Sequence, residues 1–172
     1  MIDRYKARLV AKGYTQTYGV DYQETFAPVV KMNTIRVLLL LTVNMNWPLK
    51  QFNVKNALEE EVYMDFPSGY GVENNCGKVC RLRKALYGLK QSPRTWFGRF
   101  AEAMKKYGYR QGNFDHTLFI KHGGDRVILF IIYVDDMVVT YDDLDEIEKL
   151  QMNIASKFEM KNLRGLKYFL GI

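Results

Sequence analysis

Two adjacent aspartates, Asp135 and Asp136, stand in the middle of the apolar run 127–140. No lysine or arginine lies within eight residues of the pair on either side. The β-branched and aromatic residues that flank the pair favour strands, so we expect the aspartates at the turn of a β-hairpin. A carboxylate buried without a partner is costly, and such groups are paired, protonated or bound to a metal ion. The pattern therefore predicts a hairpin that meets either a cationic side chain from elsewhere or a divalent metal ion.

The length and composition indicate one core. The chain has 172 residues, 48% of them hydrophobic, which is enough for one domain or part of one. No apolar run reaches the roughly 18 residues that span a bilayer, and the N-terminus lacks the apolar stretch of a signal peptide. We therefore expect a soluble, intracellular protein. The spacing of Cys76, Cys80, His116 and His122 does not match a structural zinc site. Because intracellular thiols are kept reduced, we expect reduced, structurally incidental cysteines, with a disulfide as the alternative.

The net charge of +6 is unevenly distributed along the chain. Residues 78–110 contain ten lysines or arginines and one acid, Glu102, whereas residues 125–149 contain eight acids and two bases. A run of charge is commonly a solvated face. Beside a carboxylate pair it has a second interpretation, in which the basic sector binds a polyanion and the acidic centre binds metal ions.

Hydrophobic periodicity predicts three helices. The first covers 34–45, follows Asn33 as its N-cap, and is apolar enough to be buried on most sides. The second has Ser92 as its N-cap and Pro93 in its first turn, and it ends at Gly108 with an aromatic stripe facing the core. The third is capped by Asp142 or Asp143. Its expected core stripe is Leu144, Ile147, Leu150, Ile154 and Phe158.

Strand patterns occur between these helices. We expect strands at 51–54, 61–65, 78–83, 117–121 and 127–134, turns at 67–71 and 122–125, and a last apolar strand at 166–172. Hairpins and helices in this order predict an α+β fold, an antiparallel sheet with helices packed on one face. An apolar strand at the C-terminus suggests that the chain stops within the fold.

Seven segments, in this order, resemble the reverse transcriptase of copia-type retrotransposons. They are 5–16 (YKARLVAKGYTQ), 21–29 (DYQETFAPV), 53–57 (NVKNA), 60–64 (EEVYM), 85–94 (ALYGLKQSPR), 133–136 (YVDD) and 166–171 (LKYFLG). The resemblance implies a single fragment, 1–172, of an RNA-directed DNA polymerase, a nucleotidyltransferase domain of a Pol polyprotein. Residues 1–33 would be fingers-like and 34–172 mainly palm, with the thumb and RNase H absent.

The resemblance also implies a site. Two Mg²⁺ ions, or Mn²⁺ in vitro, would bind Asp135 as the main ligand and Asp136 as the secondary one, with position 53 as the third member. The partners would be an RNA or DNA template-primer and a dNTP, and no membrane would be involved. The protein would be located in the cytoplasm, in a virus-like particle, or in the nucleus. The oligomeric state stays open. The matching nucleotide-binding positions are Lys6, Arg8, Val54, Tyr87 and Gly88. The matching nucleic-acid-binding positions are Lys84, Lys90, Ser92, Pro93, Arg94 and Gly171.

Two departures from the family pattern predict a degenerate, inactive enzyme. Asn53 replaces the third carboxylate, and Ala57-Leu58 runs directly into Glu59 where the family has an aromatic residue and a short loop. Misplacing reacting groups by about 1 Å can cost on the order of 10²-fold in rate, so both changes should be severe. Asn53 could instead be an ordinary strand-end residue. The alternative functions are a nucleic-acid-binding remnant without catalysis, a remnant that only partly folds, and a non-polymerase metal enzyme.

Overall fold

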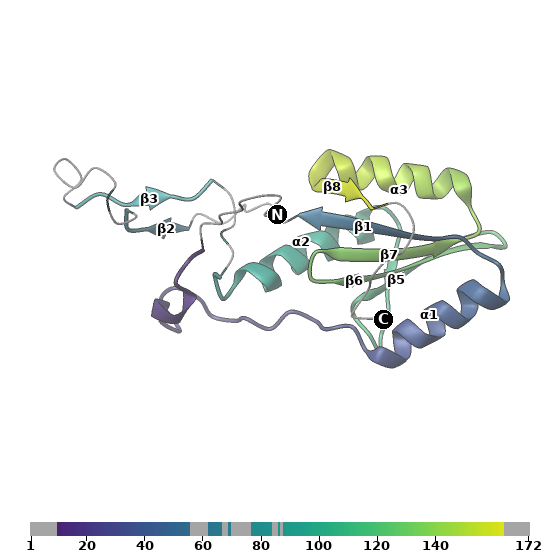
Figure 1. Cartoon of the computed structure of the whole chain (residues 1–172), viewed down its shortest axis with the longest axis horizontal. Coiled ribbons are helices and arrows are strands. Elements are labelled where there is room, and N and C mark those ends of the chain that lie inside the picture. Colours follow the sequence, from purple (N-terminus) through teal and green to yellow (C-terminus); the bar gives the residue numbers. More distant parts are fainter. Residues whose placement is uncertain are drawn as a thin grey trace, which may run out of the picture. The chain divides into compact units, whose positions relative to one another are not determined.

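The computed structural model of the chain describes residues 10–55, 62–66, 69, 77–83, 86 and 88–163 (Figure 1). The chain divides into two compact units, a first unit of 1–25 and 57–92 and a second unit of 26–56 and 93–172. The helices are α1 (Met32–Asn44), α2 (Ser92–Lys106) and α3 (Leu144–Lys157), with a 3-10 turn η1 (Gly13–Thr15). The strands are β1 (Leu49–Lys55), β2 (Tyr63–Met64), β3 (Cys80–Arg81), β4 (Arg110–Gln111), β5 (Leu118–Gly123), β6 (Arg126–Tyr133), β7 (Asp136–Tyr141) and β8 (Glu159–Asn162).

The second unit is built on a six-stranded sheet with the strand order β4-β5-β6-β7-β1-β8. Every neighbouring pair in it is antiparallel. This confirms the α+β prediction and the strands expected at 51–54, 117–121 and 127–134. The expected turn at 122–125 joins β5 to β6, where Gly123 pairs with Arg126.

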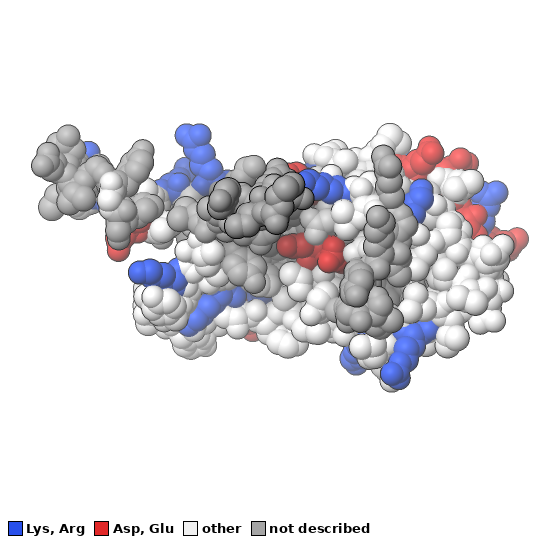
Figure 2. Space-filling view, in the orientation of Figure 1, with Lys and Arg blue, Asp and Glu red and all other residues white. Residues whose placement is uncertain are grey.

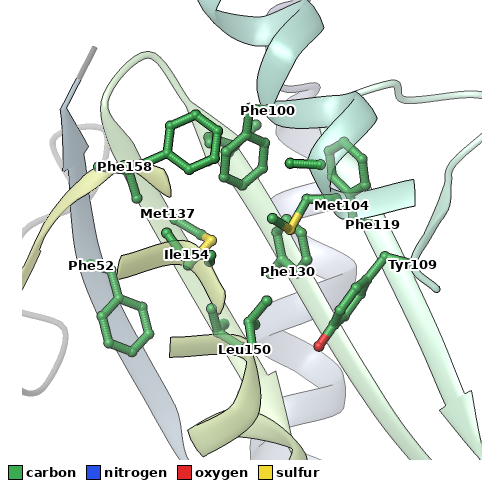
Figure 3. Close-up of a cluster of buried hydrophobic side chains, with 14 of the residues drawn as sticks. Phe52, Phe100, Met104, Tyr109, Phe119, Phe130, Met137, Leu150, Ile154 and Phe158 are labelled. Atoms are coloured by element: carbon green, nitrogen blue, oxygen red, sulfur yellow. The ribbon is translucent and has the colours of Figure 1, made fainter. Parts of the chain in front are cut away.

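One face of this sheet is covered by α2 and α3. Side chains of both helices meet Phe52, Phe130 and Met137 of the strands in one buried cluster (Figure 3). Phe130 stacks on Phe119 with ring centroids 4.9 Å apart and meets Phe100 edge-on at 6.0 Å. Aromatic pairs in these arrangements add stabilisation beyond the area they bury. The main core of the protein therefore lies between this face and the two helices.

The opposite face is covered by α1, which lies across the sheet from α3 (Figure 1). Ile35 and Leu38 of the helix pack with Ile131 of β6 and Val138 of β7. The prediction that the helices pack on one face is therefore wrong. The physical reason is the composition of β6. The side chains that it directs to one face and those that it directs to the other are both mainly apolar, so both faces must be covered.

The first helix also differs from its prediction at its N-terminus. α1 begins at Met32 with Lys31 in the cap position, so Asn33 is not the N-cap, and Lys31 makes no side-chain cap bond. Asp115, from the loop before β5, supplies the missing acceptor: its Oδ2 accepts from the Lys31 backbone N–H at 2.9 Å and from Thr34 Oγ1 at 2.6 Å. A carboxylate that is distant in the sequence thus accepts hydrogen bonds at the N-terminus of α1, as the side chain of a local N-cap residue would.

The expectation that this helix is buried on most sides is wrong as well. Its buried residues form one stripe, Ile35, Leu38 and Thr42. The apolar residues exposed beside that stripe include Val37, Leu40 and Val43, which are 56%, 61% and 79% exposed. A single helix on one sheet face buries only the stripe that contacts the sheet, whatever the composition of its other sides.

The other two helices follow their predictions more closely. The aromatic stripe of α2 is buried as expected, but the helix begins at Ser92 itself, whose Oγ has no hydrogen-bond partner, so the predicted cap bond is not formed. Asp143 caps α3 by accepting from the Glu146 N–H at 3.1 Å. The α3 stripe is buried from Ile147 onward, whereas Leu144 is 65% exposed because contact with the core starts one turn later.

In the first unit, β2 and β3 form a two-stranded antiparallel sheet, which confirms shorter versions of the strands expected at 61–65 and 78–83. Cys80 is a free thiol. The turn expected at 67–71 falls outside the described residues except for Gly69, and Cys76 and the strand expected at 166–172 lie outside them entirely. In the described part of the chain, no helix has the length and apolar character to cross a bilayer.

Candidate functional site

The aspartate pair lies at a two-residue hairpin turn. Tyr133, at the end of β6, pairs with Asp136, at the start of β7, so that Val134 and Asp135 form the turn between them. This confirms the predicted hairpin. Both aspartates are half-buried rather than fully buried. Figure 2 shows acidic side chains gathered where Figure 1 places the β6–β7 turn.

The backbone of this turn is strained. Val134 has a φ of 54°, in the left-handed region that β-branched residues avoid. Two-residue hairpin turns that match the twist of their strands need a positive φ at the first central position, and glycine or asparagine is the usual residue there. A non-glycine residue held in such a conformation costs on the order of 1–3 kcal/mol and persists only where its surroundings fix it. The strands on either side therefore impose the conformation of the turn.

Strand β1 brings Asn53 to the aspartates. The sheet register places Asn53 directly opposite Asp136, and the Asn53 Nδ2 amide donates to Asp136 Oδ1 at 3.3 Å. The Val54 N–H donates to the Asp135 carbonyl oxygen at 2.7 Å. The structure therefore brings together the three positions that the resemblance assigned to a metal site. The Val54 side chain is fully buried in the core with α2 and α3. It therefore has no exposed atom with which to make the predicted contact with a nucleotide.

A lysine that the sequence analysis did not identify lies in cross-strand register with these residues. On the other edge of β1, Lys161 of β8 is in register with Asn53. Residues directly opposite in antiparallel strands point to the same face, so Asp136, Asn53 and Lys161 form one polar row across three strands. The next row on this face, which contains Ile131 and Val138, is covered by α1. In the polar row itself, Tyr133 of β6, which pairs with Asp136, still packs against this cluster.

The donor set fits a metal ion that keeps outside ligands. The Asp136 carboxylate and the Asn53 amide meet here, with Asp135 next to Asp136 in the turn, and among the described residues there is no cluster of three or more His, Cys, Asp or Glu that would enclose an ion. Mg²⁺ is commonly held by one or two carboxylates, with water and substrate phosphates completing its octahedron. The arrangement suits an open ion site and does not suit a closed structural one.

Lys90, one of the predicted nucleic-acid contacts, has partners inside the first unit. Its Nζ lies 3.3 Å from the Gln16 carbonyl oxygen, 3.2 Å from Tyr22 Oη, and 4.7 Å from the centre of the Tyr22 ring. Its backbone N–H donates to Gln16 Oε1 at 2.8 Å. Lys90 therefore holds the segment 16–22 in place, and a phosphate contact would have to compete with these bonds.

Gly88, a predicted nucleotide contact, has a packing role in the first unit. A Cβ at Gly88, whose φ is +101°, would lie 2.4 Å from the Ala11 carbonyl oxygen, and a Cβ at Gly13 would lie 2.0 Å from the Gly88 carbonyl oxygen. Real Cβ atoms do not approach so closely, so the two backbones touch only because both residues are glycine.

The remaining predicted positions divide into two groups. At the start of α2, Ser92 is buried, whereas Pro93 and Arg94 are exposed; Arg94 Nη1 lies 3.5 Å from the Phe26 carbonyl oxygen. The structure therefore presents Arg94 to solvent, as a nucleic-acid contact requires. The positions that lie outside the described residues are Lys6, Arg8, Lys84, Tyr87 and Gly171, together with the deletion after Ala57.

Comparison with known proteins identifies the family. Residues 1–172 match a family model described as reverse transcriptase (RNA-dependent DNA polymerase). The Retrovirus-related Pol polyproteins from transposons RE1 and RE2 of Arabidopsis thaliana are 41% and 42% identical over 99% of the chain. That from transposon TNT 1-94 of Nicotiana tabacum is 41% identical over 98%.

The chain spans 12–13% of the length of these three relatives. No solved structure matches the chain. The family match and the three relatives confirm the resemblance seen in the seven sequence segments, and the chain belongs to the reverse transcriptase family.

Proposed function

We propose that this chain is the part of an RNA-directed DNA polymerase that carries the catalytic carboxylates. The second unit would be the palm and the first unit part of the fingers, so that 57–92 move from the expected palm to the fingers and 26–33 move from the expected fingers to the palm. The observation that carries the proposal is the register of β1 with β7, which sets position 53 beside Asp136 at the turn that carries Asp135. These positions are 82 and 83 residues apart in the sequence (135 − 53 and 136 − 53), and only the sheet brings them together.

Metal ions held by Asp135 and Asp136 would supply Lewis-acid chemistry, namely activation of a primer 3′-hydroxyl and charge stabilisation at the α-phosphate of a dNTP. The protein's part is to hold the ligands in place. Asp136 is fixed by β7 and by its hydrogen bond to Asn53, while Asp135 belongs to the turn that the Val54 N–H ties to β1. Ligands fixed on a sheet meet the demand for small positional error at a reacting centre.

Asn53 supports a further proposal, that polymerase activity is weak or absent. Its amide contributes no charge, and its Nδ2 donor, not its oxygen, is directed at Asp136. To serve as a metal ligand, the amide would have to rotate and give up this hydrogen bond. A carboxylate at the same position would add a negative charge beside Asp135 and Asp136, which favours divalent cations.

Primer extension on poly-rA with an oligo-dT primer and Mg²⁺ or Mn²⁺ tests both proposals. We expect the chain to incorporate dTMP at background level and Asn53→Asp to incorporate more. The matched control is Asn53→Asp combined with Asp135→Asn. This double variant has the net charge of the unchanged chain but lacks the main ligand, so its activity should return to background. Robust incorporation by the unchanged chain would contradict the loss of activity. If Asn53→Asp incorporates dTMP above background, equal activity of the double variant would contradict the role of Asp135.

A nucleic-acid-binding remnant without catalysis is a second candidate. The observation in its favour is the solvent face of α2, where Arg94, Lys105 and Lys106 are exposed with one acid, Glu102. Phosphate contacts release counterions, so log K should fall with log salt by about 0.9 per contact on duplex DNA. Fluorescence anisotropy should give a slope smaller by about two units for Lys105→Gln/Lys106→Gln than for the unchanged chain. A salt-independent affinity would contradict this function.

A further inference from the structure

We propose that Lys161 is the resident cation of the aspartate pair, that is, a positive group of the protein itself that balances part of their negative charge. We propose that it thereby weakens the binding of divalent metal ions there. This inference rests on the proposed function, in which Asp135 and Asp136 form a metal platform. It adds a residue that opposes the metal. The observation behind it is the polar row, in which Lys161 of β8 and Asp136 of β7 flank Asn53 in cross-strand register.

The packing of the neighbouring residues fixes the face on which this row lies. Phe52 and Val54 of β1 and Met137 of β7 belong to the core with α2 and α3, and Met160 of β8 packs against that core. Because side chains alternate along a strand, the residues between them point to the opposite face. Lys161 is therefore on the same side of the sheet as Asp136, and it is exposed, so its flexible stem has room to turn toward the carboxylates.

The separation is short enough for the charges to interact. Neighbouring strands lie about 4.8 Å apart, so two strands apart is roughly 10 Å along the row. This is close to the Debye length of about 10 Å at 0.1 M salt, and screening there is incomplete. Asn53, which lies between, carries no charge that would cancel the interaction. An ammonium at this distance stabilises the carboxylates without a metal and repels a divalent ion bound to them.

A lysine on an edge strand has a simpler explanation, because lysines at sheet edges discourage pairing with other chains. Metal affinity separates the two explanations. A purely edge-protecting lysine would leave the affinity of the aspartate pair unchanged. A resident cation would change the free energy of metal binding in proportion to the charge removed and would lose its effect in high salt.

The experiment measures the affinity for Mn²⁺ by the electron paramagnetic resonance signal of the free ion. It uses the full chain and Asn53→Asp, each with and without Lys161→Gln, in dilute buffer. Coulomb's law for charges of +1 and +2 at roughly 10 Å in water gives about a fourfold effect, so Lys161→Gln should bind Mn²⁺ about four times more tightly. Lys161→Glu changes the charge by twice as much and should bind about 15-fold more tightly. Both gains should disappear at 1 M KCl, where the Debye length is about 3 Å.

The matched control is Lys149→Gln, which removes another exposed lysine, from α3 on the other face of the sheet. It should leave Mn²⁺ affinity unchanged. If Lys161→Gln equals the unchanged chain, or binds more weakly, while Asn53→Asp binds more tightly, Lys161 is not the resident cation and the metal platform stands. If Mn²⁺ binds in neither background, both this inference and the proposed metal platform are wrong.

Discussion

The two faces of the six-stranded sheet are covered to different extents. On one face, α2 and α3 bury an aromatic cluster that reaches from β5 to β1. On the other, α1 contributes one buried stripe, and of the described apolar residues in the row of Asp136, Asn53 and Lys161 only Tyr133 packs against its cluster. The face covered by two helices holds the larger buried cluster, and on the other face the aspartates are half-buried. The same strands contribute to both because successive side chains point to opposite faces.

The largest expected effect is on the face covered by two helices. Phe130→Ala should lower the free energy of unfolding by about 3–5 kcal/mol, because Phe130 is fully buried and contacts the rings of Phe119, Phe100 and Tyr109. Urea denaturation followed by circular dichroism measures the change. The variant for comparison on the other face is Ile35→Ala in α1.

We expect a smaller loss for Ile35→Ala, about 2 kcal/mol, at the low end of the range for isoleucine in a core. A single helix with solvent on its outer side can move toward the sheet and fill part of the space left behind. Equal losses for the two variants would contradict the difference between the faces. They would mean that α1 is held as tightly as the other two helices.

Asp115 anchors α1 to its face, and its replacement should have the second largest effect. Its Oδ1 accepts from the Thr117 N–H and Oγ1 at 3.0 and 2.6 Å, while its Oδ2 accepts from Lys31 and Thr34. Burial raises the pKa of this carboxyl, but the four hydrogen bonds outweigh it and leave the pKa below its ordinary value. Asp115→Asn should cost about 2–3 kcal/mol at pH 7, because an amide nitrogen cannot accept these bonds.

The lowered pKa gives this prediction a pH dependence. The Asp115 carboxylate stabilises the fold fully above the unfolded-state pKa of about 3.9, and its contribution is lost as the pH falls through the lower folded-state pKa. The difference in stability between the chain and Asp115→Asn should therefore shrink as the pH is lowered below about 4. Urea midpoints at pH 7 and pH 3 measure it. A difference that stays constant between the two would contradict the assignment of the hydrogen bonds to the ionised form.

These two regions also show what the sequence can and cannot predict. The buried stripes of α2 and α3 and the hairpin at Asp135 were predictable, because each follows from residues close together in the chain. The anchoring of α1 by Asp115 was not predictable, because Lys31 and Asp115 are 84 residues apart and neither has a local pattern that indicates the other. The same reason hid Lys161, whose place beside Asn53 depends on the register of β8 with β1. The position of Asn53 beside Asp136 was expected only through the family resemblance.

The smallest expected effect is at the turn between β6 and β7, at the edge of both faces of the sheet. Here the change should increase the free energy of unfolding and not lower it. Val134→Gly should stabilise the protein by about 1 kcal/mol, because glycine removes a strain of about 1–3 kcal/mol and loses roughly 0.5–1 kcal/mol through the greater freedom of the unfolded chain. Val134 is 62% exposed, so little packing is lost. Val134→Ala is the control, because it keeps a Cβ at positive φ and should gain much less. If the two variants are equally stable, the strain at Val134 is not set by its φ, and the strands do not impose the turn that presents Asp135 and Asp136.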